Sequence, residues 1–313
     1  MTCRICNSNH IKDRFWANEM LQGSRLEFEY FICADCSTVQ IMSTSLDMSK
    51  YYNGTYYSLN GSIKSKKNFL SGLRNDFIFA GKNQIAGSIL EKMFPIYKEH
   101  KVVASYLHPE RHLLDIGCGN GDFLRTLRTS GVKKLTGIEP FLAESIEIDS
   151  DFKLIKGDIS SLDEKFDLIR LHHVFEHVPN PRQTLYQVSG LMNDNAIVIL
   201  TIPIADFVFR KYKQHAYVLQ APHHFHLFSI EGICELLTSS GFFIDNLIRN
   251  AKGISNWLFM SELWSNDVSL DEWSTTSKKI DIHRKMKQFK LIEKDLINQG
   301  LGDNLTLVLK KVN

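Results

Sequence analysis

Apolar positions in the C-terminal three quarters of the chain alternate between two kinds of segment. Short apolar runs are separated by longer stretches in which apolar residues recur about every three or four positions. The short runs predict buried strands and the longer period predicts helices packed on a sheet. Strands are predicted at 112–116, 132–138, 152–155, 166–173, 196–202, 242–248 and 305–310, and helices at 122–130, 182–192, 230–240 and 277–298. Strands alternating with helices favour an α/β fold around a mainly parallel sheet.

The segment 68–107 carries a helical pattern of its own. Its apolar residues include Leu70, Ile85, Ile89 and Met93, which we expect to face the core. Pro95 is expected to kink or divide this helical region, because proline removes a helix hydrogen bond.

Three glycines follow the first predicted strand. Gly117, Gly119 and Gly121 lie two residues apart between a strand and a helix, where they let the backbone turn tightly and approach a ligand. The acids Asp115 and Asp122 flank this loop, which disfavours a pyrophosphate and favours a cation. S-adenosylmethionine has no phosphate and carries an ammonium and a sulfonium, so it suits the loop better than a dinucleotide.

Polar residues also stand at the ends of the next three predicted strands. Glu139 lies 18 residues beyond Gly121, close to the spacing at which an acid holds a ribose diol. Asp158 ends the third strand, where it can meet an adenine amino group, and His173 ends the fourth.

In this order, the stretches DIGCGNG, GIEP, KGDI and FDLI…EHVPNP resemble those of the class I S-adenosylmethionine-dependent methyltransferases. The resemblance implies a doubly wound, seven-stranded, Rossmann-like sheet within 67–313, with a helical insertion at 251–300. It assigns Asp115, Gly117 and Gly119 to the methionine end of the cofactor. It assigns Glu139 to the ribose, Asp158 to the adenine and either His172 or His173 to the neighbourhood of the methionine.

Two C-x-x-C pairs precede this domain, at Cys3 and Cys6 and at Cys33 and Cys36. Two such turns can complete a tetrahedral thiolate site, so 1–50 is predicted to be a small zinc-ribbon-like module with one structural zinc ion. A redox pair or uncommitted thiols are the alternatives.

Charge argues against nucleic acid as the partner. The formal net charge is +2, and residues 1–50 hold five basic against six acidic side chains. Phosphate contacts supply most non-specific affinity for nucleic acids, and this module has no basic excess to make them. With no apolar leader after Met1, the sequence predicts a cytoplasmic enzyme that does not act at a membrane.

Tyrosine and histidine are concentrated in two separate stretches. Residues 51–66 form a tyrosine-rich linker that serves either as packing between domains or as a lid over a polar, ring-shaped substrate. Seven of the twelve histidines fall between 172 and 226, and histidine is the usual general base near neutral pH.

The segment 222–229 resembles a stretch of bacterial sugar methyltransferases, whose members also have paired cysteines and a tyrosine-rich segment. The resemblance places His224 on the general base, His177 on a further active-site histidine and Tyr57 among the lid phenols. His223 stands where the family has an acid, and the chain stops where C-methylating members continue. We therefore expect O-methylation of a sugar or nucleotide-linked sugar, by an enzyme that could form homo-oligomers.

The sequence leaves three other functions open. The run His173-x-x-Glu176-His177 resembles the divalent-metal motif of quinone O-methyltransferases, with one carboxylate missing. A zinc-module RNA methyltransferase and a non-catalytic protein that binds S-adenosylmethionine are the other two.

Overall fold

The computed structural model describes residues 2–51, 69–269, 272 and 282–312. The chain divides into two compact units. Unit 1 comprises Met1–Asp47, His173–Thr184 and Thr201–Leu307, and unit 2 comprises Met48–His172, Leu185–Leu200 and Val308–Asn313. No helix among the described residues is long and apolar enough to span a bilayer.

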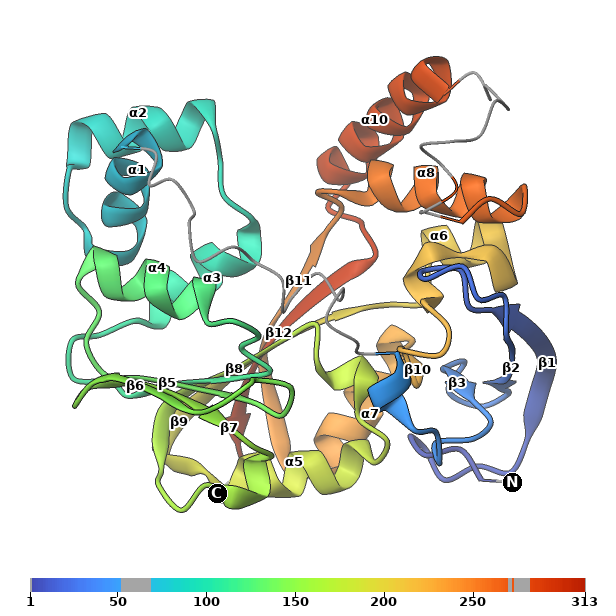
Figure 1. The fold of residues 1–313 in the computed structure, drawn as a ribbon, viewed down its shortest axis with the longest axis horizontal. Coiled ribbons are helices and arrows are strands. Elements are labelled where there is room, and N and C mark those ends of the chain that lie inside the picture. Colours follow the sequence, from blue (N-terminus) through green and yellow to red (C-terminus); the bar gives the residue numbers. More distant parts are fainter. Residues whose placement is uncertain (1, 52–68, 270–271, 273–281, 313) are drawn as a thin grey trace. The chain divides into compact units, whose positions relative to one another are not determined.

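A mixed sheet has the strand order β11-β12-β9-β8-β4-β5-β7-β6. Its strands are β4 (Leu113–Ile116), β5 (Leu135–Glu139), β6 (Ile146–Asp149), β7 (Phe152–Lys156), β8 (Phe166–His172), β9 (Met192–Pro203), β11 (Phe242–Asn250) and β12 (Asn304–Lys311). In unit 2, β8, β4, β5 and β7 run parallel side by side (Figure 1). In this register Asp115 lies opposite Gly137 on one side and Arg170 on the other. These parallel strands are the Rossmann-like centre that the sequence predicts.

Among the described residues this sheet has eight strands, whereas the sequence predicted seven. The additional strand, β6, pairs antiparallel with β7 at the edge of the sheet. Its residues Ile146–Asp149 are almost entirely exposed, so the strand lacks the buried apolar run on which the sequence prediction relied.

The core of unit 2 comes from the apolar runs of these strands. Leu113 and Leu168 are fully buried, and Leu124 and Leu127 of helix α4 (Asp122–Ser130) pack into the same core. Gly137 of β5 lets that helix approach, since an added Cβ would lie 2.6–2.8 Å from Cys118, Leu124 and Leu154.

Three further helices belong to unit 2, α1 (Phe69–Ala80), α2 (Gln84–Met93) and α3 (Lys98–Tyr106), with Pro95 between the last two as predicted (Figure 1). The prediction that Leu70, Ile85, Ile89 and Met93 face the core is wrong, because they are 50%, 79%, 52% and 63% exposed. Helix α2 instead approaches α1 through Gly87, where an added Cβ would lie 2.2 Å from Phe77. The absence of a side chain at Gly87, and not the apolar stripe, decides which face of α2 is buried.

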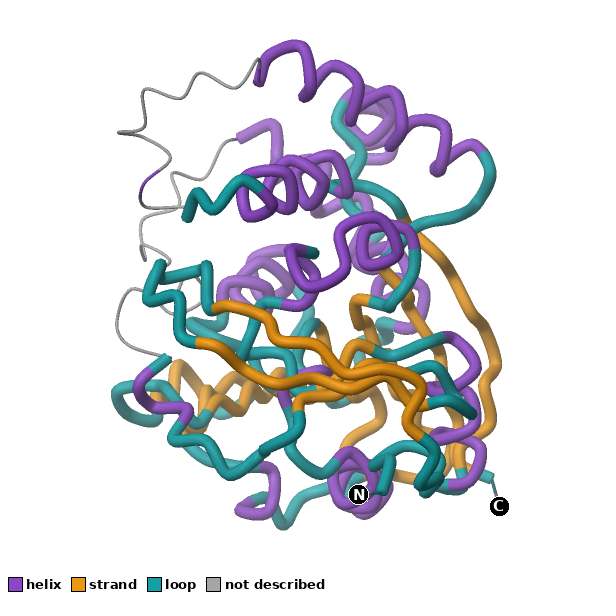
Figure 2. Tube along the Cα trace, turned by 90° about the vertical axis from the view of Figure 1, so that its right-hand side faces the viewer, coloured by secondary structure: helices purple, strands orange, loops and turns teal. Residues whose placement is uncertain are grey.

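The described part of unit 1 contains a second sheet of four strands with the order β1-β2-β3-β10. Its strands are β1 (Ile11–Asn18), β2 (Glu27–Cys33), β3 (Val39–Ile41) and β10 (His226–Leu227), drawn in orange in Figure 2. Strand β10 pairs antiparallel with β3, with His226 opposite Gln40. The histidine-rich segment thus completes the N-terminal sheet.

The remaining helices are α5 (Pro181–Gly190), α6 (Phe207–Tyr212), α7 (Ile230–Ser239), α8 (Ile254–Ser265) and α10 (Ile282–Asn298). Within unit 1, α8 packs against α6 and α10. Short 3-10 helices cover Met48–Lys50, Ile159–Ser161, Phe175–His177, Lys213–His215 and Tyr217–Leu219. The predicted boundaries 1–50, 51–66 and 67–313 stay a prediction, and Tyr57 of the linker lies outside the described residues.

Candidate active site

The glycine loop has the left-handed backbone that the sequence predicts. Gly117, Gly119 and Gly121 have φ values of 69°, 54° and 79°. The N–H of Gly117 donates to Ile138 O at 2.8 Å, which holds the loop against the end of β5. At Gly121 an added Cβ would lie 2.7 Å from a Leu154 methyl group, so this position requires glycine for both conformation and space.

Glu139 closes the loop from the end of β5. Its two carboxylate oxygens accept hydrogen bonds from Gly119 N at 3.2 Å and from Phe141 N at 3.1 Å. Burial raises the pKa of Glu139, the two N–H groups oppose that rise, and the nearby Asp115 adds to it. Both oxygens of the Glu139 carboxylate are thus held in place beside a glycine loop whose backbone a ligand can approach closely. A ligand with two neighbouring hydroxyl groups could donate to both oxygens.

Asp115 is paired with a residue that the sequence prediction missed. Arg170 of β8 donates to Asp115 Oδ1 at 2.7 Å, and its guanidinium lies 4.1 Å from the centre of the Phe123 ring. Both charged side chains are buried. Burial raises the pKa of Asp115, and Arg170 opposes the rise. No donor among the described residues contacts Asp115 Oδ2, so this oxygen can accept from a ligand.

We expect Arg170→Met to destabilise the fold by about 3–5 kcal/mol, because it leaves the Asp115 carboxylate buried without its partner. Urea denaturation measures the change in the free energy of unfolding. Arg125→Met, which changes a half-buried arginine of α4, is the control and should stay within about 1 kcal/mol of wild type. Equal stability of the two variants would refute the role given to the pair.

Asp158 lies at the surface of unit 2. Its side chain accepts a hydrogen bond from Ser160 N at 3.0 Å and caps the following 3-10 helix. The carboxylate is exposed and keeps acceptor capacity for a further donor.

In unit 1, the adjacent residues Glu176 and His177 come together with His224, which is distant in sequence, and these three form the histidine cluster. Glu176 and His177 lie on the 3-10 helix after β8, and His224 lies before β10. The potential ligand atoms of these three residues all lie within 4.8 Å of one another, and the rings of His177 and His224 meet edge to face with centres 4.7 Å apart. The sequence named Glu176 only within a local run, because nothing local brings position 224 beside it.

Burial controls the charges in this histidine cluster. It lowers the pKa of His177 and lowers the pKa of His224 to about 3, so both imidazoles are neutral at pH 7. For Glu176, burial works to raise the pKa, but the hydrogen bond with His173 and the nearby histidines outweigh it, and the pKa lies below its ordinary value. The cluster therefore presents one carboxylate and two neutral imidazoles at neutral pH.

His173 contributes to the same cluster as a partner of Glu176. Its Nδ1 lies 3.3 Å from Glu176 Oε1, and its N–H donates to Thr201 O at 2.9 Å. Its φ of 54° is unusual for a residue other than glycine and turns the chain sharply after β8.

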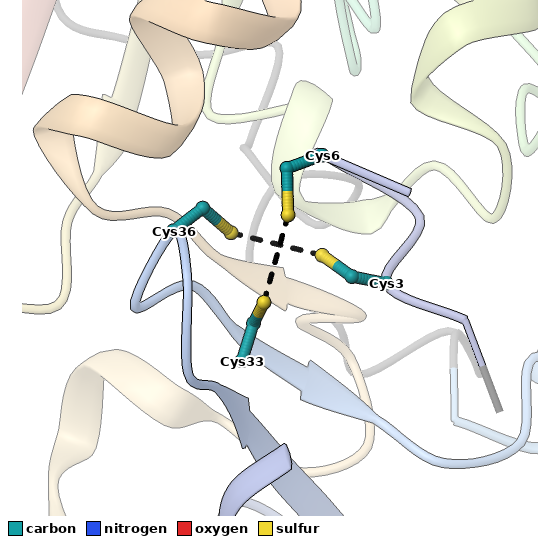
Figure 3. A group of neighbouring side chains, drawn as sticks. All are labelled: Cys3, Cys6, Cys33 and Cys36. Carbon is teal, nitrogen blue, oxygen red and sulfur yellow. Dashed lines mark hydrogen bonds between the residues drawn. The ribbon is translucent and has the colours of Figure 1, made fainter. Parts of the chain in front are cut away.

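The four N-terminal cysteines form a second cluster in unit 1 (Figure 3). The Sγ atoms of Cys3 and Cys36 are 3.6 Å apart, as are those of Cys6 and Cys33. Four thiolates at about 2.3 Å from a central zinc ion would lie about 3.8 Å from one another, so the cluster fits a tetrahedral metal. Gln40 Nε2 also donates to Cys3 Sγ at 2.9 Å, which is an outer contact typical of metal-bound sulfur.

The two C-x-x-C turns have the same backbone. Asn7 and Ser37, which follow the second cysteine of each pair, have φ values of 61° and 59°, and their N–H groups donate to Cys3 O and Cys33 O. Both residues thus adopt the conformation for which glycine is commonly used.

The glycine loop and the parallel strands around it are those expected of a methyltransferase domain. The model of the family described as "Methyltransferase domain" matches residues 84–247, which is more than half of the chain, and the chain belongs to this family. The general prediction from the sequence motifs is therefore confirmed.

A curated relative, the tRNA U34 carboxymethyltransferase of Nautilia profundicola, is 30% identical over 100 residues. The match covers 29% of this chain and 33% of the relative, so the chain spans about a third of the length of the curated relative it matches.

Two solved structures are similar to this chain. A cyclopropane synthase of Mycobacterium tuberculosis is 15% identical with a TM-score of 0.46, over 79% of this chain and 100% of its own. An O-methyltransferase of Brevibacillus brevis, solved with S-adenosyl-L-homocysteine, is 15% identical with a TM-score of 0.41, over 71% of this chain and 77% of its own.

Proposed function

We propose that the enzyme transfers the methyl group of S-adenosylmethionine to a hydroxyl group of a sugar or nucleotide-linked sugar. The methyl-donor assignment is supported by the glycine loop, which has left-handed backbone and donates a hydrogen bond from Gly119 N to Glu139. Next to it, Asp115 Oδ2 has no hydrogen-bond donor among the described residues. The sugar assignment is supported by the resemblance of segment 222–229 to sugar methyltransferases and by the neutral imidazoles that this segment and His177 supply.

In this proposal unit 2 supplies the contacts to the ammonium, the ribose and the adenine. The Asp115 carboxylate and the Gly117 and Gly119 backbone serve the methionine end, where the ammonium is a donor for Asp115 Oδ2. Glu139 accepts from the two ribose hydroxyls, and the exposed Asp158 accepts from the adenine amino group. His173 is assigned to the methionine neighbourhood.

We expect Glu139→Ala to weaken S-adenosylmethionine binding by about 1.5–3 kcal/mol, because hydrogen bonds to a charged group are lost. Isothermal titration calorimetry measures the dissociation constant. Glu147→Ala removes an exposed carboxylate from the edge strand β6 and should bind like wild type. Unweakened binding by Glu139→Ala, or tight binding of NAD to the wild type, would contradict the assignment.

The reaction forms a bond between the acceptor oxygen and the methyl carbon as the bond from that carbon to sulfur breaks. The bonding electron pair stays on sulfur, which gives S-adenosylhomocysteine, and the acceptor hydroxyl loses its proton. Most of the catalysis in such an in-line displacement is alignment, and removal of the proton supplies the rest. We assign the acceptor side to His224, His177 and Glu176, with Tyr57 of the linker as a further contributor.

We propose one structural zinc ion on Cys3, Cys6, Cys33 and Cys36, supported by the sulfur spacing and the paired turns. Its effect on catalysis is indirect. Arg182 of α5 donates to Ile5 O, and Ser229 donates to Cys36 O. The segments that follow His177 and His224 in the chain are therefore both hydrogen-bonded to the cysteine turns.

A turnover screen tests the function. The enzyme is incubated with S-adenosylmethionine and single nucleotide sugars, and release of S-adenosylhomocysteine is measured against reactions without acceptor. Methylation of a sugar hydroxyl, located by mass spectrometry and NMR, is the expected result. Turnover with tRNA and not with sugars, accompanied by salt-dependent gel shifts, would replace the sugar acceptor with RNA.

A further inference from the structure

The three side chains of the histidine cluster include a carboxylate oxygen that needs a cationic partner. Glu176 is fully buried, and its Oε1 lies 3.3 Å from His173 Nδ1. Within the part of the chain that the structure describes, no donor reaches Glu176 Oε2. A buried carboxylate oxygen without a partner is costly, so this atom should bind a positive group.

The two imidazole rings are held in a defined tautomer by backbone carbonyl groups. His177 Nδ1 lies 2.8 Å from His223 O, and His224 Nδ1 lies 2.7 Å from Val218 O. A carbonyl oxygen only accepts, so each Nδ1 carries the proton and each Nε2 carries the lone pair. Metal-binding histidines commonly donate their other ring N–H to a backbone carbonyl, which fixes the ring as seen here.

We propose that Glu176, His177 and His224 bind a divalent first-row transition metal ion through one carboxylate oxygen and two imidazole nitrogens. Their ligand atoms lie within 4.8 Å of one another, so modest side-chain rotation brings each to about 2.0–2.2 Å from a shared ion. The mixed nitrogen and oxygen set suits zinc, iron, cobalt or manganese better than calcium or magnesium. His177 is the least buried of the three.

This site differs from the local run that the sequence suggested. In the run His173-x-x-Glu176-His177, the first histidine would be a ligand. The structure instead brings His224 into the ligand set, while His173 contacts Glu176 as an outer partner.

The catalytic consequence rests on the proposed function. An ion bound here would polarise the acceptor hydroxyl and lower its pKa, so that the proton leaves to solvent water before or during methyl transfer. His224 Nε2 would then hold the ion and would not take the proton itself.

Equilibrium dialysis of the full chain against micromolar Zn²⁺, followed by elemental analysis, tests the site. The wild type should bind one zinc ion beyond the cysteine-bound equivalent. Both His224→Ala and Glu176→Gln should lose this additional ion and keep the first. His215→Ala, which removes another histidine of the same region, should bind as the wild type does. Glu176→Gln keeps the size and shape of the side chain. Loss of the ion in this variant therefore cannot be attributed to a cavity such as the one that His224→Ala creates.

The outcomes separate the metal site from the proposed function. A wild type that binds no additional zinc, or variants that keep it, would overturn the metal site. Sugar methylation by a wild-type enzyme with no additional zinc would leave the proposed function standing and return His224 to the role of direct base. Additional zinc without any sugar turnover would leave the metal site standing and reject the sugar acceptor.

Discussion

Cys33→Ser is expected to lose the bound zinc and to unfold the N-terminal sheet under conditions in which the wild type is folded. Cys33 is fully buried at the end of β2, and its sulfur faces Cys6. Zinc bound by such sites contributes about 10–16 kcal/mol in isolated zinc-finger peptides at pH 7, so even a fraction of that would exceed the stability of a small sheet. Elemental analysis and thermal unfolding of protein purified without added metal measure both effects.

Cys234→Ser is the matched control, because Cys234 is a half-buried cysteine of α7 outside the cluster. It should retain one zinc ion per chain and near-wild-type stability. Less than about half an equivalent of zinc in the wild type would reject the zinc site, and so would unchanged thermal stability in Cys33→Ser.

His224→Ala is expected to reduce kcat by about 10²–10⁴-fold, the range for losing the group that activates the acceptor. The affinity for S-adenosylmethionine should stay within twofold of wild type, about 0.4 kcal/mol, because the assigned cofactor contacts come from other residues. His177→Ala should raise KM for the acceptor first. Steady-state kinetics with the acceptor from the turnover screen, and calorimetry with the cofactor, separate these effects.

His215→Ala serves as the control and should keep kcat and KM. A His224→Ala enzyme within threefold of wild-type kcat would remove His224 from the mechanism and leave His177 as the acceptor-side residue. A large loss of cofactor affinity in the same variant would indicate a structural role for His224 instead.

Several features of the fold could be predicted because the residues that cause them are neighbours in the chain. Helix α4 begins and ends where the sequence placed it, since Gly121 and Gly131 supply the left-handed residues at its two ends. The glycine loop and the cysteine turns are likewise local, because their backbone angles depend on residue types a few positions apart. Edge strand β6 was missed because an exposed strand leaves no apolar run.

By itself, the sequence determined the α/β class, the methyltransferase family and the two cysteine pairs, because local periodicity and spacing carry that information. Only the tertiary structure decided which polar groups meet. Parallel register puts Arg170 beside Asp115, 55 positions apart in the chain, and the strand pairing of β10 accompanies the approach of His224 to Glu176. Such contacts depend on long-range hydrogen bonding and burial, which bring together positions that no local pattern relates.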